Sequence, residues 1–384
     1  MTSRIYLDHA ATTPLSEAAR QAMAPFLDAE FGNASTLYSW GRRARRALDD
    51  ARDQIAQCIG AAPAELIFTS GGTEANNAAL KGIAWSPKAR GRHLIVSAIE
   101  HHSVLEVADF LAEQGWEVSR VGVDAQGRVD PEAVRKALRP DTALVSVMLA
   151  NNEIGTLQPI AEIAALCRTH GTLLHTDAVQ AVGHIPVDVR ALNCDLLSLA
   201  AHKFGGPKGA GALYCRRGTP IVPFVHGGGQ ERERRGGTEN VAGIAGMAAA
   251  LGASLAGQSA EIGRQQALRD RLISGLLALD GVRLNGDAGA RLPGNVNVCI
   301  EGAPAEPLLL NLDMEGVAAS SGSACSSGSL EASHVLLALG RSRAEALSGL
   351  RLTLGPDNDA AQIERALEII ARCIARVRRA TAVV

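Results

Sequence analysis

The chain has 384 residues, of which 47% are hydrophobic and 3% aromatic, with 38 Lys and Arg against 40 Asp and Glu and a formal net charge of -2. This length exceeds the size at which a single core stops growing, so we expect two units with aliphatic interiors. The near-neutral charge gives no electrostatic basis for binding nucleic acid or an anionic membrane. No apolar run approaches the ~20 residues that span a bilayer, and residues 1–14 lack a signal-peptide pattern. We therefore expect a cytoplasmic protein.

Six short apolar runs recur along the first half of the chain, with helical segments between them. They cover residues 66–69, 94–98, 118–123, 143–149, 172–176 and 195–199. The intervening segments include 103–115, a helix opened by Asp130 and Pro131, and 159–171. This alternation predicts βαβ units and a largely parallel sheet, to which residues 211–215 would add a strand at an edge.

Beyond about residue 250 the pattern changes to long helical stretches rich in alanine and leucine. A hairpin-like segment covers residues 282–300, so we expect a second unit of α+β type. The last segment places apolar residues at helical spacing with arginines between them, which predicts an amphipathic helix packed on that unit. These apolar residues are Ile363, Leu367, Ile370, Ile374 and Val377.

Seven dispersed cysteines, with no CxxC pair, disfavour a disulfide framework or a structural zinc site. Cys194, Cys215 and Cys299 sit in or beside apolar runs, where we expect reduced core residues. Cys325 instead lies within SSGSACSSGS, residues 320–329, which predicts a mobile loop. Such a thiol could carry a reaction product, and the alternative is a surface linker with an incidental cysteine.

Ligands of parallel sheets bind beyond the carboxyl ends of the strands, so the residues that follow each run are candidates. The glycine-rich turn Ser70-Gly71-Gly72-Thr73-Glu74 leads into a helix whose free N–H groups suit a phosphate. An ordinary capped turn is the alternative. His101 and His102 point in different directions, which disfavours a metal pair, but one could act as an acid–base or stacking group.

Asp177 and Gln180 follow the fifth run, and a shielded acid there needs a cation or donors to stay ionised. A helix cap is the alternative for the acid. Lys203 follows the sixth run, where desolvation would lower its pKa and allow a Schiff base, whereas Lys208 is expected to be solvated. A phosphate-binding helix start, a histidine, an acid and a lysine at different strand ends form the set that pyridoxal phosphate requires.

Several stretches resemble one family in the same order along nearly the whole chain. They are YLDHAATTP, FGNAST, FTSGGTEANN, EHHSV, ANNEIGT, HTDAVQA, AHKFGGPKGAG, RRGGTEN, SSGSACSSGSLE and LRLTLG. The family is the cysteine desulfurases of the NifS and IscS type, in the class-V aminotransferase family of pyridoxal-phosphate fold type I enzymes. The resemblance implies an aspartate-aminotransferase-like α/β fold with a mainly parallel seven-stranded sheet. Residues 15–255 would form the large cofactor-binding domain, and residues 1–14 and 256–384 a smaller α+β domain carrying the Cys325 loop.

The resemblance also implies a role for each matching residue. Lys203 would hold the cofactor, Asp177 would pair with its ring nitrogen, Gln180 with its ring hydroxyl, and His101 would stack on the ring and move protons. The phosphate would be bound by Gly72, Thr73 and His202, with Thr238 reaching across from the second subunit of a homodimer. Asn152 and Arg351, with Asn33, would hold the substrate carboxylate, Asn152 also lying at the cofactor, and Cys325 would be the nucleophile.

The implied reaction converts L-cysteine to L-alanine and leaves the sulfur on Cys325 as a persulfide. The long loop resembles family members that hand the sulfur to a scaffold protein of the NifU or IscU type for iron–sulfur cluster assembly. The motifs lie nearer the NifS branch, which serves nitrogenase. No resident metal is implied, although Cys325 could briefly contact a nascent cluster.

Two departures from the family pattern bear on the site. Ala200 replaces a serine that contributes to the phosphate site, and Asn33-Ala34 replaces the usual GNP. Two other functions stay open at this point. One is a different fold type I activity, such as selenocysteine lyase, aminotransferase or β-eliminating lyase, and the other is a non-catalytic sulfur carrier.

Overall fold

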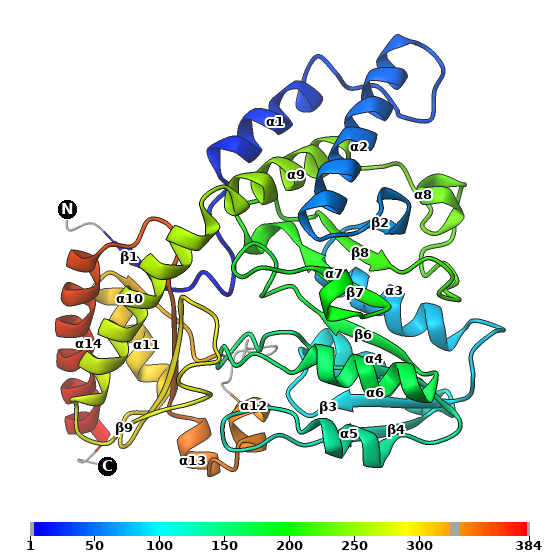
Figure 1. Cartoon of the computed structure of the whole chain (residues 1–384). Helices are drawn as coiled ribbons and strands as arrows, with labels where there is room; N and C mark the ends of the chain where they lie inside the picture. Colours follow the sequence, from blue (N-terminus) through cyan, green and yellow to red (C-terminus); the bar gives the residue numbers. More distant parts are fainter. Residues whose placement is uncertain (1–3, 323–330, 382–384) are drawn as a thin grey trace.

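The computed structural model describes residues 4–322 and 331–381. Figure 1 shows two bodies side by side, one built on a large sheet and one on smaller sheets with long helices. The seven-stranded sheet has the order β2-β8-β7-β6-β5-β3-β4. Its strands are β2 (Leu66–Thr69), β3 (His93–Ser97), β4 (Glu117–Val121), β5 (Thr142–Ser146), β6 (Leu173–Asp177), β7 (Leu196–Ala200) and β8 (Gly211–Cys215). The seven predicted strands are confirmed, with ends shifted by a few residues.

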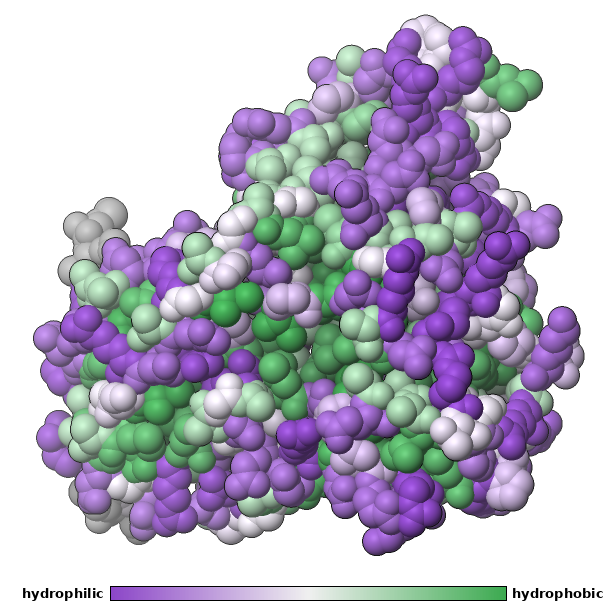
Figure 2. All heavy atoms as spheres, in the orientation of Figure 1, coloured by the Kyte–Doolittle hydropathy of each residue, from purple (hydrophilic) through white to green (hydrophobic). Residues whose placement is uncertain are grey.

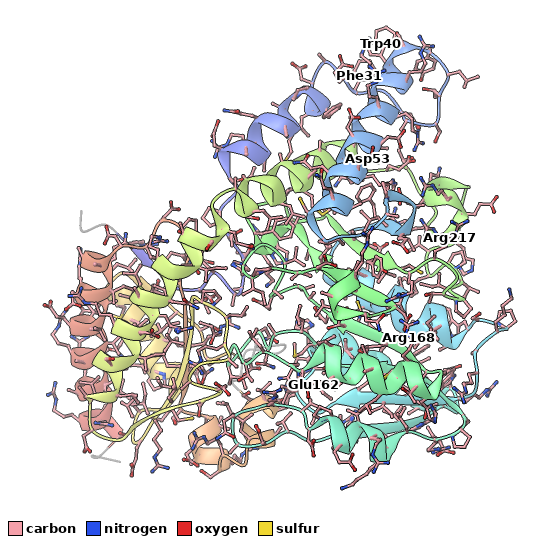
Figure 3. All side chains as sticks on the ribbon, viewed as in Figure 1. Phe31, Trp40, Asp53, Glu162, Arg168 and Arg217 are labelled. Carbon is pink, nitrogen blue, oxygen red and sulfur yellow. The ribbon has the colours of Figure 1, made fainter. Side chains whose placement is uncertain are left out.

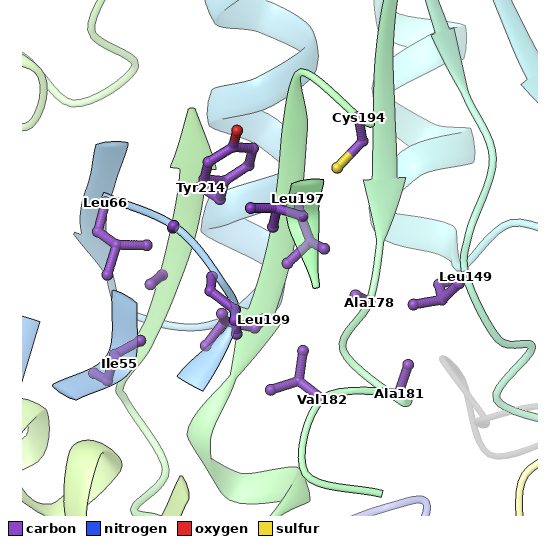
Figure 4. Close-up of a cluster of buried hydrophobic side chains, with 14 of the residues drawn as sticks. Ile55, Leu66, Leu149, Ala178, Ala181, Val182, Cys194, Leu197, Leu199 and Tyr214 are labelled. Atoms are coloured by element: carbon purple, nitrogen blue, oxygen red, sulfur yellow. The ribbon is translucent and has the colours of Figure 1, made fainter. Parts of the chain in front are cut away.

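The position predicted for the strand at residues 211–215 is wrong. β8 is not at an edge but lies between β2 and β7, and it is antiparallel to both. Parallel neighbours require a long crossover connection. The connection from β7 to β8 is short, so the chain turns back and β8 runs antiparallel beside β7. All five residues of β8 are buried, which suits an interior strand. Figure 4 shows Tyr214 of β8 between Leu66 of β2 and Leu197 of β7.

Helices cover both faces of this sheet, because successive strand residues point to opposite sides. Leu197 and Leu199 join one core with residues of three helices, α2, α6 and α9. Leu196 joins the other core with residues of α3 and α4. The helices of this body are α1 (Glu17–Leu27), α2 (Ser39–Cys58), η1 (Pro63–Glu65), α3 (Gly72–Ala84), α4 (His102–Glu113), α5 (Pro131–Ala137), α6 (Ile160–His170), α7 (Val189–Leu192), η2 (Ala201–Lys203), α8 (Gln230–Glu233) and α9 (Val241–Leu255).

The second body contains an antiparallel sheet of order β12-β10-β9 and a parallel pair of β1 with β11. These are β1 (Ile5–Tyr6), β9 (Val282–Leu284), β10 (Asn295–Ile300), β11 (Val317–Ala318) and β12 (Gly349–Thr353). Its helices are α10 (Gln258–Leu277), α11 (Ala305–Met314), α12 (His334–Ala338), α13 (Arg343–Ala346) and α14 (Ala360–Thr381). The hairpin of β9 and β10 is confirmed. The boundary between the predicted domains stays a prediction.

The amphipathic character of the last helix is also confirmed. Ile363, Ile370, Ile374 and Val377 of α14 are buried in one core with residues of β10 and β12, and Leu367 packs against it. None of the described helices is, on its own, long and apolar enough to cross a membrane, but α9 and α10, with a bend of 72° between them, pass that test together by length and composition.

An arm formed by α1, α2 and the connecting residues 28–38 projects from the large-sheet body (Figure 1). Figure 2 shows hydrophilic side chains over most of α2, whereas apolar side chains gather toward the middle of the molecule. At the far end of the arm, Phe31 and Trp40 stack with ring centroids 6.0 Å apart (Figure 3). Phe31 and Leu37 are 73% and 89% exposed, which is unusual for side chains of this size.

Candidate active site

A cavity of about 500 Å³ opens at the carboxyl ends of the strands, where ligands of such sheets bind. Its lining comes from the strand ends of the large sheet, the start of α3 and α4, and β12 of the second body. The lining residues used below are Asp8, Gly72, Thr73, Asn76, His101, Ser103, Asn152, Asp177, Gln180, Ala200, His202, Lys203, Ser320, Gly322, His334 and Arg351. Most residues assigned to a site from the sequence therefore meet in one cavity.

Lys203 is the last residue of η2, the short turn after β7, and lines this cavity. Its Nζ donates to the carbonyl oxygens of Ala10 and Ala11, at 2.5 and 2.8 Å. Burial and the nearby Arg351 guanidinium lower the pKa of Lys203 to about 8, although Asp177 acts in the opposite direction. Near neutral pH a useful fraction of this amine is therefore uncharged and nucleophilic.

Asp177, the last residue of β6, is held by two donors. Asn76 Nδ2 lies 2.7 Å from its Oδ2, and the backbone N–H of Val179 lies 2.9 Å from its Oδ1. The residue is 5% exposed, so these two donors satisfy its carboxyl oxygens away from bulk water. Gln180, three residues on, donates from Nε2 to the carbonyl of Ala10 at 3.0 Å.

The start of α3 forms another wall of the cavity. Gly71 precedes the helix with φ +153°, a value that favours glycine, and Gly72 and Thr73 are the first helical residues. The N–H groups of a first helical turn lack partners within the helix and attract anions. Burial and two lysines lower the pKa of His202 to about 4, so this ring is a neutral donor or acceptor beside that wall.

Arg351 of β12 lies on the side of the cavity formed by the second body. Its Nη2 is 2.8 Å from Asp8 Oδ1, and its Nη1 is 3.0 Å from the carbonyl oxygen of Asn152. Its buried Nε has no hydrogen-bond partner among the described residues. Arg351 lines the cavity, and the planar set of N–H donors of a guanidinium matches an anion such as a carboxylate.

Of the assigned residues that the structure describes, two do not line this cavity. Asn33 lies on the arm, where its side chain accepts from the backbone N–H of Ser35, and Thr238 is exposed between α8 and α9. Neither residue lines the cavity of its own chain, so their roles stay predictions. Cys325 lies outside the described residues. Ser320 and Gly322 before that gap, and His334 after it, line the cavity.

Among the cavity residues that sequence reasoning missed, three make the hydrogen bonds and the ion pair on which the account of this site depends. Asp8 lies in the motif YLDHAATTP, but nothing in the sequence points to its ion pair with Arg351. Asn76 follows Thr73 by three residues and so shares its helix face, which was a usable signal. Ser103 follows His101 by two residues, at the start of a predicted helix.

The residues present fit pyridoxal phosphate. The cavity places a lysine with lowered pKa, a buried carboxylate and a helix N-terminus around one space, which is the donor set that the cofactor's aldehyde, ring nitrogen and phosphate require. Ala200, where the family has serine, lines the cavity near the start of α3, with its Cβ 3.6 Å from the position that a Cβ on Gly72 would take. It offers no hydrogen bond from its side chain.

Comparison with known proteins gives one consistent result. The family described as Aminotransferase class-V matches residues 5–366. The cysteine desulfurase IscS of Dictyoglomus turgidum is 48% identical over 379 residues, covering 98% of this chain and 96% of the relative. That of Methanosarcina thermophila is 47% identical, covering 97% and 93%. A solved structure named NifS-like protein superposes with a TM-score of 0.91 at 35% identity, covering 97% of this chain and 100% of the other.

The fold, the cavity and these similarities define a pyridoxal-phosphate-dependent enzyme of fold type I. Within that class, the chain belongs to the cysteine desulfurases of the NifS and IscS type, in the class-V aminotransferase family. The curated relatives carry the IscS name and the structural relative the NifS name, so the preference for the NifS branch stays a prediction.

Proposed function

We propose that this enzyme converts L-cysteine to L-alanine and leaves the sulfur on Cys325 as a persulfide. The observation that carries the proposal is the position of Lys203, Asp177 and Arg351 around one cavity, whose lining also includes Gly322. Cys325 is three residues beyond Gly322. At ~3.6 Å per residue, covalent geometry keeps its Cα within about 11 Å of that cavity residue.

The substrate carboxylate binds Arg351 and Asn152 in this proposal. The guanidinium of Arg351 supplies the donors, and Asp8 keeps it oriented through its 2.8 Å contact. Gly72, Thr73 and His202 hold the cofactor phosphate, and Gln180 holds the ring hydroxyl. These contacts orient the substrate so that its α-hydrogen and its sulfur face different parts of the cavity.

Bound pyridoxal phosphate supplies an electron sink for charge that develops on the substrate. Asp177 keeps a negative charge beside the ring nitrogen and so maintains the ring in its electron-accepting form. Lys203, once its amine is free, takes the proton from the substrate's α-carbon, because its lowered pKa makes the amine an effective base near neutral pH. His101 stacks on the ring and takes part in proton movement.

The sulfur transfer balances without an added oxidant or reductant. The Cys325 thiolate attacks the substrate sulfur, so an S–S bond forms while the substrate Cβ–S bond breaks. The electron pair of the broken bond stays with the carbon fragment, which takes up a proton and leaves as L-alanine. The thiolate is the reactive form, so the Cys325 proton must first pass to a base in the cavity.

A homodimer completes the site in this proposal, with Thr238 of each subunit contacting the cofactor phosphate of its partner. Thr238 is exposed on its own chain and follows Gly237, whose φ is +99°. The exposed apolar tip of the arm, with Phe31 and Leu37, supports association with a second copy, because large apolar patches mark interfaces.

The persulfide sulfur passes to a scaffold protein of the NifU or IscU type for iron–sulfur cluster assembly, and the motif likeness to the NifS branch favours a nitrogenase-related role. The cytoplasm is the proposed location. Cys325, besides carrying the sulfur, could briefly contact a nascent cluster on that scaffold.

Mass spectrometry after treatment with L-cysteine tests the proposal. We expect one added sulfur on the peptide that contains Cys325, together with L-alanine in equal amount in the first turnover. Cys325→Ser should lose both the added sulfur and sustained turnover, whereas Cys299→Ala, which changes a buried cysteine of β10, should keep them. Pyruvate and ammonia in place of alanine would instead indicate β-elimination and refute the proposal.

A further inference from the structure

A continuous chain of hydrogen bonds joins Asp177 to His101 through two side chains that have no role in the mechanism above. Asn76 Nδ2 lies 2.7 Å from Asp177 Oδ2 and 2.8 Å from Ser103 Oγ. Ser103 Oγ lies 2.8 Å from His101 Nδ1. All four residues line the cavity, and Asn76 and Ser103 are buried. The chain therefore runs from β6 through α3 to the start of α4.

The direction of each bond follows from the carboxylate. An ionised carboxylate only accepts hydrogen bonds, so the NH2 group of Asn76 must face Asp177. The same NH2 group lies within reach of Ser103 Oγ and donates its second hydrogen there. Ser103 Oγ accepts from Asn76, so its own hydrogen is free to be donated to His101 Nδ1.

A second contact also shows that Nδ1 of His101 accepts a hydrogen bond. The backbone N–H of Ser103 also donates to His101 Nδ1, at 3.1 Å, which makes His101 the N-cap of α4. A backbone N–H cannot accept, so Nδ1 must carry a lone pair in this arrangement. The single proton of the neutral imidazole then lies on Nε2.

We infer that Asn76 and Ser103 are positioning residues that hold His101 as its Nε2–H tautomer in the resting enzyme. His101 thereby presents a hydrogen-bond donor, not a base, at the nitrogen left available to the cavity. It accepts a proton only after Nδ1 is released from Ser103. This inference deepens the proposed function and rests on it for the place of His101 at the cofactor.

The charged surroundings of His101 agree with a neutral ring. The titratable groups around it are Asp177 of β6, Lys203 after β7, the neighbouring His102 and His334 of α12. Burial lowers the pKa of His101 most, Lys203 and His102 lower it further, and Asp177 acts in the opposite direction. A neutral imidazole with a fixed tautomer is the state that the hydrogen bonds require.

Nitrogen NMR of protein labelled with ¹⁵N-histidine tests the inference, because protonated and unprotonated ring nitrogens resonate far apart. The spectra are recorded on the holoenzyme and on cofactor-free protein, and His101→Gln identifies the signals among ten histidines. We expect an unprotonated Nδ1 and a protonated Nε2 at neutral pH in both forms.

The two hydrogen bonds donated to Nδ1 of His101 stabilise its neutral ring. Ser103→Ala removes one of these two donors. We expect the imidazole titration, and the acid limb of the kcat/KM profile, to move up by roughly half to one pH unit, with a larger share of the Nδ1–H tautomer. Asn76→Ala should move both in the same direction by less. Ser103→Thr keeps a hydroxyl and should restore the wild-type behaviour.

Ser119→Ala is a matched control, because its hydroxyl lies 2.9 Å from Nε2 of a different histidine, His93. It should leave the His101 signals unchanged. A wild-type spectrum with protonated Nδ1, or a Ser103→Ala enzyme with unchanged tautomer and titration, would overturn the inference. Failure of persulfide formation with the expected spectra would refute the proposed function and leave the tautomer assignment intact.

Discussion

The pKa of the Lys203 amine is already lowered in the cofactor-free protein. Burial removes its hydration, and the guanidinium of Arg351 disfavours a second positive charge nearby, which together lower the pKa of Lys203 to about 8. Only the neutral amine attacks an aldehyde. The same two causes therefore control how fast the cofactor-free enzyme captures pyridoxal phosphate.

We predict that the capture rate of the cofactor-free enzyme rises about tenfold per pH unit below pH 8 and levels off above it, since the cationic amine is unreactive. Stopped-flow absorbance of the reconstitution measures this. Arg351→Gln removes the cation, so its midpoint should move to higher pH. Arg168→Gln, on the exposed surface of α6 (Figure 3), should leave the midpoint unchanged. A wild-type rate that keeps rising to pH 10 would contradict the prediction.

At the scale of residues, sequence patterns predicted the site residues that directly follow a strand. They did not predict the residues that position these side chains by hydrogen bonds. Lys203, Asp177 and His101 each follow a strand run, so the topology of parallel sheets was enough to bring them together. The link between them was not accessible, because Asn76 and Asp177 are 101 positions apart and Asn76 and Ser103 are 27 apart. Such contacts depend on how the helices pack, which periodicity does not specify.

At the scale of elements, the outer edge of β2 is closed by side chains instead of another strand. Arg52 Nη1 donates to the carbonyl of Leu66 at 3.0 Å, and the N–H of Phe68 donates to Glu231 at 2.9 Å. Arg52 and Glu231 are themselves joined at 2.6 Å and nearly fully buried. They satisfy the backbone groups that an open edge would expose. Glu231 begins a run of three residues with φ between 47° and 63°, which L-residues rarely adopt.

We predict that Arg52→Met destabilises the protein by about 3–5 kcal/mol, because it leaves the buried carboxylate of Glu231 without its cation. The free energy of unfolding in urea measures this. Glu30→Gln breaks the ion pair of Glu30 with Arg43, which is partly exposed, and should cost less than about 1 kcal/mol. Equal losses for the two variants would show that the β2 edge does not depend on the buried pair.

The error in the predicted position of β8 belongs to this scale as well. An apolar run such as GALYC indicates a buried strand, but a run buried on both faces fits any interior place in a sheet. The short connection from β7 places β8 antiparallel beside that strand, and β2 pairs with the other side of β8. α14 was predictable because its pattern is long and strongly periodic, and its partner core lies on one face only.

At the scale of the whole molecule, the arm carries apolar surface that its own chain does not cover. Phe31 and Leu37 are 73% and 89% exposed, and Trp40, stacked on Phe31, is 46% exposed. Figure 3 shows Phe31 and Trp40 at the end of the arm, away from the sheet. Burial of a Phe or Leu side chain contributes about 1.5–3 kcal/mol. In a two-fold dimer each of these residues would be buried in both subunits, so each would contribute two copies.

We predict that the double variant Phe31→Glu, Leu37→Glu weakens the proposed homodimer by about a hundredfold or more, since it would place charges where the proposed interface buries two apolar side chains per subunit. Sedimentation at several protein concentrations measures the dissociation constant. Because Thr238 is proposed to complete the partner's phosphate site, the monomer should also release its cofactor more readily. Met314→Glu, on α11 and 81% exposed, should stay dimeric. A double variant that dimerises as wild type and keeps its cofactor would exclude the arm from the interface.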